Sequence, residues 1–102
     1  MTFFVLENAT APITGGSVPL NVAQATFQAT VAGTGTVSAT VVVQVSNSLD
    51  LGWTDLATIT LSGSSIATDG FAINAPWSMV RAKVTAIAGT NAKVTVVSTP
   101  FE

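Results

Sequence analysis

The stretch QATFQATVAGTGTVSATVVVQVS, residues 24–46, decides the fold. Apolar side chains alternate with Gln and Thr before the glycines, and a second alternating run with many valines follows them. Alternation with a period of two is typical of a β-strand that has one buried and one exposed face. The segment GTG, residues 33–35, predicts a hairpin loop between two such strands. The predicted inward side chains are those of Ala25, Phe27, Ala29, Val31, Val37, Ala39, Val41, Val43 and Val45.

The same pattern continues toward the carboxyl terminus, and we find no amphipathic helix. Short strands at this spacing, separated by turn residues, predict an all-β fold, a single antiparallel β-sandwich or barrel-like domain. A chain of 102 residues has room for one such domain. The further strands are predicted over residues 53–62, 65–73, 78–87 and 92–98, with turns at 69–70 and 89–91.

The amino-terminal part differs in composition, and we divide the chain into an N-terminal arm or irregular lead-in, residues 1–22, and a β-sandwich domain, residues 23–102. Residues 7–21 contain two prolines and a glycine pair, with weak alternation. The preceding MTFFVL is too apolar to extend into solvent. We therefore expect it to pack either on the sheet of this domain or on a neighbouring subunit.

Two similar stretches, VAGTG at 31–35 and IAGTN at 87–91, follow comparable predicted strands. They indicate either a faint internal duplication or the repeated use of the same turn chemistry. We favour repeated turn chemistry, because glycine-containing hairpin loops arise independently in many β-proteins.

Charge is unusually scarce, at 8% of residues against roughly 25% in an ordinary soluble domain. A net charge of −2 with three basic residues argues against nucleic-acid binding, which needs a basic stripe. No apolar run approaches the roughly 20 residues that span a membrane, and the amino terminus lacks the pattern of a signal peptide. A surface of Thr, Ser, Ala, Asn and Gln is poorly protected against association, so we expect much of it to be covered in an assembly.

Catalytic and metal sites have little support in the sequence. Cysteine and histidine are both absent, which removes thiolate ligands and the commonest general base. A Ser–Lys pair would have to use Lys83 or Lys93, and no nucleophile motif accompanies either. Paired carboxylates, or a calcium site in the loop before Trp53, are conceivable, but turn chemistry explains these acids better. The residues considered for these two sites are Asn47, Asp50, Asp55 and Asp69. We therefore predict a non-enzymatic protein with no cofactor and no metal.

Three aromatic residues, Trp53, Phe71 and Trp77, lie in or next to predicted strands. Exposed tryptophans hold sugars in many carbohydrate-binding modules, so this set is a possible sugar platform. Large aromatic side chains also close the ends of β-sandwich cores. We favour the core role.

The three cations lie on the last two predicted strands. By parity, Arg81 and Lys83 share the outer face of the first, and Lys93 is expected near them across a hairpin. Lysines on strands protect edges from unwanted pairing. The alternative is a positive patch that meets an acidic partner, with Arg81 as its best member because its planar guanidinium suits a bidentate contact.

Residues 45–63 and 68–96 resemble small all-β virion proteins of tailed bacteriophages. The similarity covers about half of the chain. It consists of a Ser- and Asp-containing loop before a Trp-led strand, an Asp-Gly-Phe turn, and a Pro-Trp step into a strand that contains VRA. The residues that carry it are Ser48, Asp50, Trp53, Leu56, Asp69, Gly70, Phe71, Trp77, Val80, Arg81, Ala82 and Gly89.

The resemblance implies a structural role on the phage particle. The expected function is capsid decoration or cement, with the major capsid protein and further copies of the chain as partners; a tail or fibre component is the alternative. The expected location is the virion, assembled in the cytoplasm of the bacterial host. Charge-poor surfaces are typical of obligate interfaces. The residues expected at subunit contacts are Phe3, Phe4, Leu6, Arg81, Lys83 and Phe101.

Overall fold

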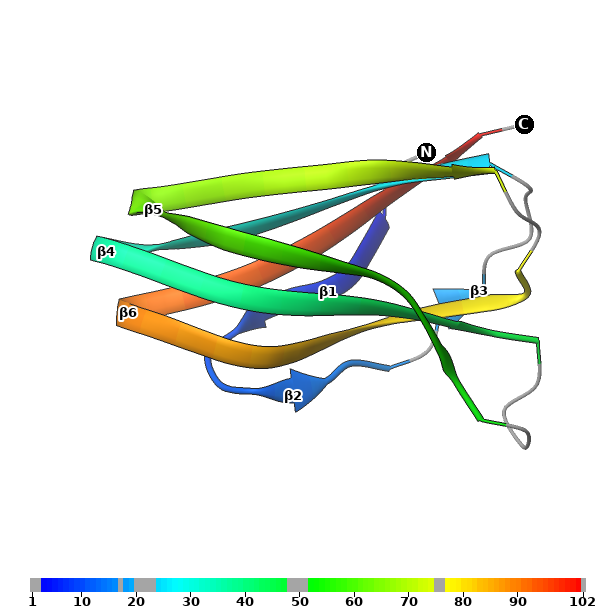
Figure 1. Ribbon diagram of the computed structural model, residues 1–102, viewed down its shortest axis with the longest axis horizontal. Helices are drawn as coiled ribbons and strands as arrows, with labels where there is room; N and C mark the ends of the chain where they lie inside the picture. Colours follow the sequence, from blue (N-terminus) through cyan, green and yellow to red (C-terminus); the bar gives the residue numbers. More distant parts are fainter. Residues whose placement is uncertain (1–2, 17, 20–23, 48–51, 75–76, 102) are drawn as a thin grey trace.

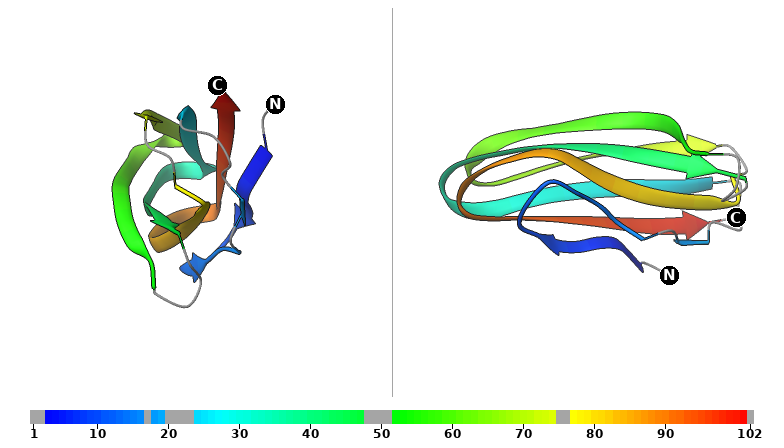
Figure 2. Two further views of the ribbon diagram at one scale, coloured as in Figure 1. Left: turned by 90° about the vertical axis from the view of Figure 1, so that its right-hand side faces the viewer. Right: turned by 90° about the horizontal axis from the view of Figure 1, so that it is seen from below.

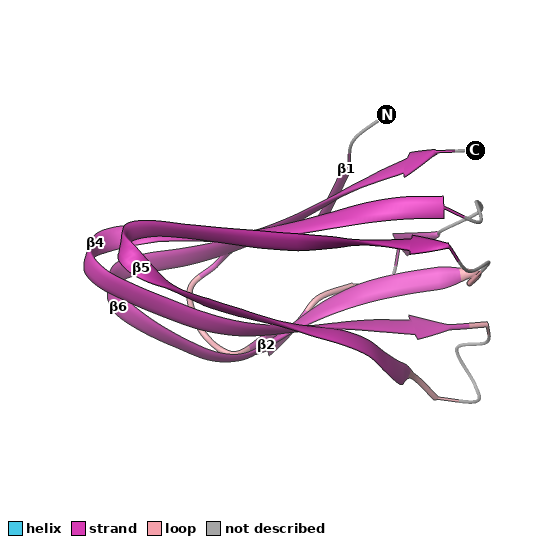
Figure 3. Cartoon of the chain, turned by 45° about the horizontal axis from the view of Figure 1, so that its top comes forward, coloured by secondary structure: helices cyan, strands magenta, loops and turns pink. Residues whose placement is uncertain are grey.

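The computed structural model describes residues 3–16, 18–19, 24–47, 52–74 and 77–101. Every regular element in these ranges is a strand, so the predicted all-β fold is confirmed (Figures 1 and 3). Ser48 and Asp50 of the predicted loop lie outside the described residues. The strands are β1 (Phe3–Ala9), β2 (Ile13–Thr14), β3 (Val18–Pro19), β4 (Gln24–Ser46), β5 (Thr54–Asn74) and β6 (Met79–Phe101).

The three long strands double back on themselves. β4 contains 23 residues, which would span about 76 Å if straight, at ~3.3 Å per residue. The longest dimension of the molecule is 38 Å. β4, β5 and β6 therefore fold over together at one end, and their halves form the two layers of a sandwich (Figure 2, right).

At least one residue with positive φ lies at each fold-over. These residues are Gly35 in β4, Ser65 in β5, and Gly89 and Asn91 in β6. The hairpin loop predicted at residues 33–35 was wrong, because β4 is one strand that passes from layer to layer there. Its two halves pair with β5 and β6 and meet across the core. A glycine with positive φ allows a sharp bend, but it does not determine whether the flanking segments pair edge to edge or stack face to face.

The strand order is β1-β6-β4-β5, with β2 and β3 also beside β6. All pairs are antiparallel. β1 extends one layer beside the second half of β6, while β2 and β3 extend the other layer beside its first half. β5 therefore forms one side of the sandwich and the amino-terminal strands form the opposite side (Figure 2, left).

The inward side chains predicted along β4 are all buried in one core. Phe27 of β4 stacks against its cross-strand partner Phe71 of β5, with ring centroids 5.3 Å apart. The turn predicted at Asp69–Gly70 was wrong, since β5 runs through both residues and Gly70 is paired with Gln28. Gly70 instead allows a close approach of two strands, because a Cβ there would lie 2.4 Å from the carbonyl oxygen of Phe27.

Residues 3–6 of MTFFVL belong to the sheet of their own domain, the first of the two alternatives considered for this stretch. Val5 and Ala9 of β1 are buried in the core, and Leu6 is paired with Val96 of β6. The similar stretches 31–35 and 87–91 lie side by side at the fold-over, where Thr34 is paired with Thr90. Their shared composition fits a shared position, since both strands change layer there.

Candidate interaction surfaces

Three strands contribute to a polar cluster on the outer face of the layer that contains β2 and β3. Gln44 of β4 lies between Asp55 of β5 and Arg81 of β6 in the sheet register. Arg81 Nε donates to Gln44 Oε1 at 2.8 Å, and Gln44 Nε2 donates to Asp55 Oδ1 at 2.8 Å. The guanidinium carbon of Arg81 lies 4.3 Å from the centroid of the Trp53 ring.

This cluster links the strands and covers Gln44, which is only 9% exposed although its position faces outward. The amide relays hydrogen bonds between a guanidinium and a carboxylate, and the indole ring attracts the guanidinium by a cation–π interaction. Arg81 thus has partners within its own chain. Alternation in the sequence assigned Gln44 to the outer face, but the cross-strand neighbours that cover it depend on the sheet register.

Lys83 and Lys93 lie on different layers of the sandwich. The expected proximity of Lys93 to Arg81 and Lys83 was wrong, because residues 89–91 carry β6 into the other layer instead of forming a hairpin. Both lysines are exposed, and in the part of the chain that the structure describes neither has an ion-pair partner.

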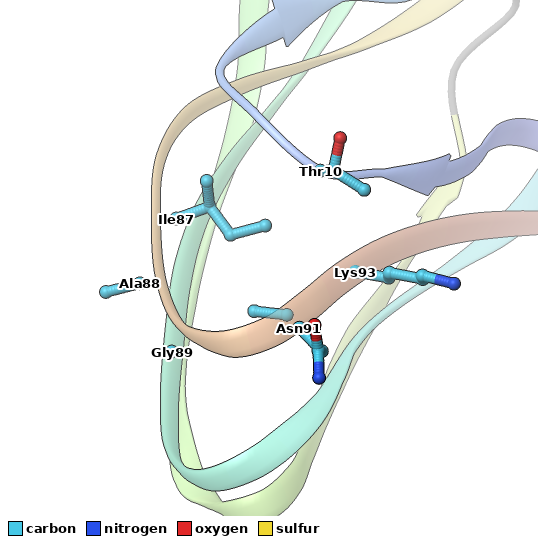
Figure 4. A pocket seen from close by; sticks show the side chains of 7 residues that line it. Thr10, Ile87, Ala88, Gly89, Asn91 and Lys93 are labelled. Atoms are coloured by element: carbon cyan, nitrogen blue, oxygen red, sulfur yellow. The ribbon is translucent and has the colours of Figure 1, made fainter.

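Each lysine lines a hollow beside the amino-terminal strands. The hollow at Lys83 has a volume of about 510 Å³ and includes Pro12, Ile13 and Thr14 of the β2 region. The hollow at Lys93 has a volume of about 260 Å³ and lies between the β6 bend and Thr10, after β1 (Figure 4). Both hollows combine one ammonium group with apolar surface.

The three aromatic residues considered as a sugar platform have separate roles. Phe71 and Trp77 pack against the hydrophobic core, and one face of Trp53 is covered by Arg81. Each of the three side chains therefore has a contact within its own chain.

The expected contact residues near the chain ends lie on β1 and β6. Phe4 is 58% exposed on β1, whereas Leu6 is partly buried against the core. Phe3 is the first residue of β1 and Phe101 the last residue of β6; their side chains lie outside what the structure describes. Phe4 is therefore the apolar surface residue in this group.

Two of the side chains considered for calcium, Asn47 and Asp55, have other partners. Asn47 Oδ1 accepts a hydrogen bond from the backbone N–H of Ser78 at 3.1 Å, and Asp55 Oδ1 is bound by Gln44. Asp50 lies outside the described residues. Within the described ranges, no group of three or more His, Cys, Asp or Glu side chains is placed to hold a metal. No helix there is long and apolar enough to cross a membrane.

The open edge of β5 is a surface that the sequence interpretation missed. In the described structure, β5 pairs along its 21 residues with β4 on one side, and its other side is unpaired. Its charges are Asp55 and Asp69. Ile66, at the bend, is 60% exposed. Periodicity identifies strands but not their order in a sheet, so the sequence carries no signal that β5 is the outermost strand.

No known protein-family model matches the chain, and no curated protein sequence does. A solved structure with a similar fold is that of the SPBc2 prophage-derived protein YomS. The similarity has a TM-score of 0.63 and covers 96% of this chain and 88% of that chain, at 18% sequence identity. The chain therefore shares its fold with a prophage-derived protein.

Proposed function

We propose that the chain is a non-enzymatic structural protein of a phage particle, a capsid decoration or cement protein that binds the major capsid protein and its own copies. The observation that carries the proposal is the long, charge-poor, unpaired edge of β5 on a sandwich that has its own complete core. The fold shared with a prophage-derived protein supports the phage context.

An open edge of this length favours a role in assembly. Unpaired backbone N–H and C=O groups along a strand are a template for pairing with another chain, and monomeric proteins usually shield them. Obligate interfaces are also poor in charge and more apolar than other surfaces. β5 combines both properties, because it has two charges and an exposed isoleucine over 21 residues.

The test is to locate the chain in purified phage particles by mass spectrometry and electron cryomicroscopy. The proposal expects many copies on the outer surface of the capsid. Density confined to the tail or its fibres would support the alternative of a tail or fibre component. Absence of the chain from purified particles would contradict both.

β1 offers a separate test of the amino-terminal contact predicted from the sequence. Deleting residues 1–6 would remove the buried Val5 and uncover β6. Loss of incorporation could then result from damage to the fold rather than from a lost contact. Phe4→Ser alters an exposed side chain and should leave the thermal unfolding unchanged. We expect this variant to fold normally and to be incorporated poorly; normal incorporation would exclude a role for Phe4 in the contact.

A further inference from the structure

We propose that the β5 edge of one copy binds the opposite, amino-terminal edge of a second copy, so that copies associate side by side and head to tail. The inference rests on the proposed function, because it names the surfaces through which copies of the chain bind one another. We define the amino-terminal edge as β1, β2, β3 and the two lysine-lined hollows beside them.

The strand directions allow this arrangement in both layers. Each strand in the order β1-β6-β4-β5 is antiparallel to its neighbour, so β5 is antiparallel to β1. In the other layer, β2 and β3 are antiparallel to β6, β6 to β4, and β4 to β5. β5 is therefore antiparallel to β2 and β3 as well. A second copy in the same orientation therefore continues the alternation of directions on both layers at once.

Charge differs between the two edges in a complementary way. β5 has Asp55 and Asp69 and no cation, whereas the amino-terminal edge has Lys83 and Lys93 beside its hollows and one acid, Glu7 on β1. Two β5 edges facing each other would bring four carboxylates together without a cation. Complementary charge therefore favours a contact between unlike edges over a symmetric contact between two β5 strands.

In one layer, the acid and the lysine are offset along the strands. Ile66 and Lys93 flank the same residue, Ala32 of β4, whereas Asp69 is level with Val96 of β6 and Leu6 of β1. The offset between Asp69 and Lys93 is three residues, or about 10 Å. A second copy that is shifted by this distance along the strands therefore has its Lys93 level with Asp69.

The second pair of charges lies in the other layer. Asp55 and Arg81 flank Gln44, and Lys83 is two residues beyond Arg81, which is about 7 Å. Only the two-residue strand β2 separates Lys83 from the outer limit of the edge. An adjacent strand is about 4.8 Å wide, which a lysine side chain can cross. Both layers therefore offer an acidic group to a lysine of the next copy.

The test uses the purified full-length chain and four variants in sedimentation velocity at low and high salt. A head-to-tail contact forms rings or open filaments, so wild type should form species larger than dimers that dissociate as salt rises. Asp69→Lys alone and Lys93→Glu alone should each weaken association by about tenfold or more, because like charges then face each other. An equimolar mixture of these two variants should associate again, since each supplies the charge that the other requires.

Two further variants complete the series. Asp69→Glu keeps the charge and should associate like wild type. Glu7→Lys reverses the exposed acid on β1 within the amino-terminal edge and should strengthen association, because the edge that meets the acids of β5 then becomes more positive. Unchanged circular dichroism and thermal unfolding would show that all variants fold.

A wild-type chain that stays monomeric, a dimer as the largest species, or full association of Lys93→Glu would each overturn the inference. Presence of the chain in particles with any of these results would leave the structural role intact and remove only this contact. If the variants behave as expected but the chain is absent from particles, the contact between copies stands and the structural role in the particle is contradicted.

Discussion

The two edges of the sandwich are built differently. β1 has two register irregularities against β6 and a residue with positive φ, Asn8. The segments beside the other half of β6 are two residues long, and prolines 12 and 19 lie next to or within them. β5 is 21 residues long and contains no proline.

Bulges, very short strands and prolines are the features that prevent unwanted strand pairing at an edge. The amino-terminal edge has all three. β5 has register shifts only, one at its bend opposite Ala32 and Thr36 and one opposite Val43 and Gln44. β5 does carry Asp69 at a position in register with the buried Ala29, where an acid discourages an apolar partner. The difference indicates that the amino-terminal edge does not offer a continuous strand for backbone pairing, so the proposed contact with β5 depends on side chains and charge.

The largest expected effect concerns the close contact that holds β5 against β4. Gly70→Ala should lower the free energy of unfolding by about 3 kcal/mol, because the new Cβ would lie 2.4 Å from the Phe27 carbonyl oxygen. Gly16→Ala, between β2 and β3, is the matched control, since a Cβ there meets nothing within 4 Å. Urea denaturation measures both; equal stabilities would mean that β5 is not packed as tightly as the structure indicates.

An aliphatic pair compares what each edge contributes to the core. Val5→Ala on β1 should lower the free energy of unfolding by about 2 kcal/mol, because Val5 is 5% exposed. Ile66→Ala on β5 should change stability by less than about 0.5 kcal/mol, because this side chain is mostly in solvent. Thermal denaturation of the two variants checks the difference. A large loss for Ile66→Ala would show that it serves the fold rather than a contact.

A smaller effect is expected where β6 meets Trp53. Arg81→Ala should lower the free energy of unfolding by about 1 kcal/mol, because the covered Gln44 loses a hydrogen bond and Trp53 loses its cationic partner. Lys83→Ala, two residues along the same strand, should leave stability nearly unchanged. The same denaturation assay compares them, and an equal cost for both residues would remove the structural role of Arg81.

The sequence predicted which side chains are buried better than it predicted how the strands connect. Alternation along residues 24–46 placed Phe27 and its neighbours correctly in the core. The bends at Gly35 and Gly89 were interpreted as hairpins, because a local backbone preference does not say which long-range partner each segment finds. The resulting error moved Lys93 to the wrong layer.

The surfaces were harder to predict than the core. The partners of Arg81 come from residues far apart in the sequence, Gln44 and Trp53, which only the sheet register brings together. The exposed edge of β5 depends on strand order, and period-two alternation is the same in an edge strand and a central one. Scarcity of charge led us to expect that some surface is covered in an assembly, but it did not point to a particular strand.

The head-to-tail contact between unlike edges can be tested most directly by zero-length carbodiimide cross-linking of an equimolar mixture of unlabelled and ¹⁵N-labelled chain. Mass spectrometry then separates links within a copy from links between copies. We predict links between copies that join Asp69 to Lys93 and Asp55 to Lys83. Links between copies that avoid these pairs, or no links between copies under conditions where the chain associates, would contradict the contact.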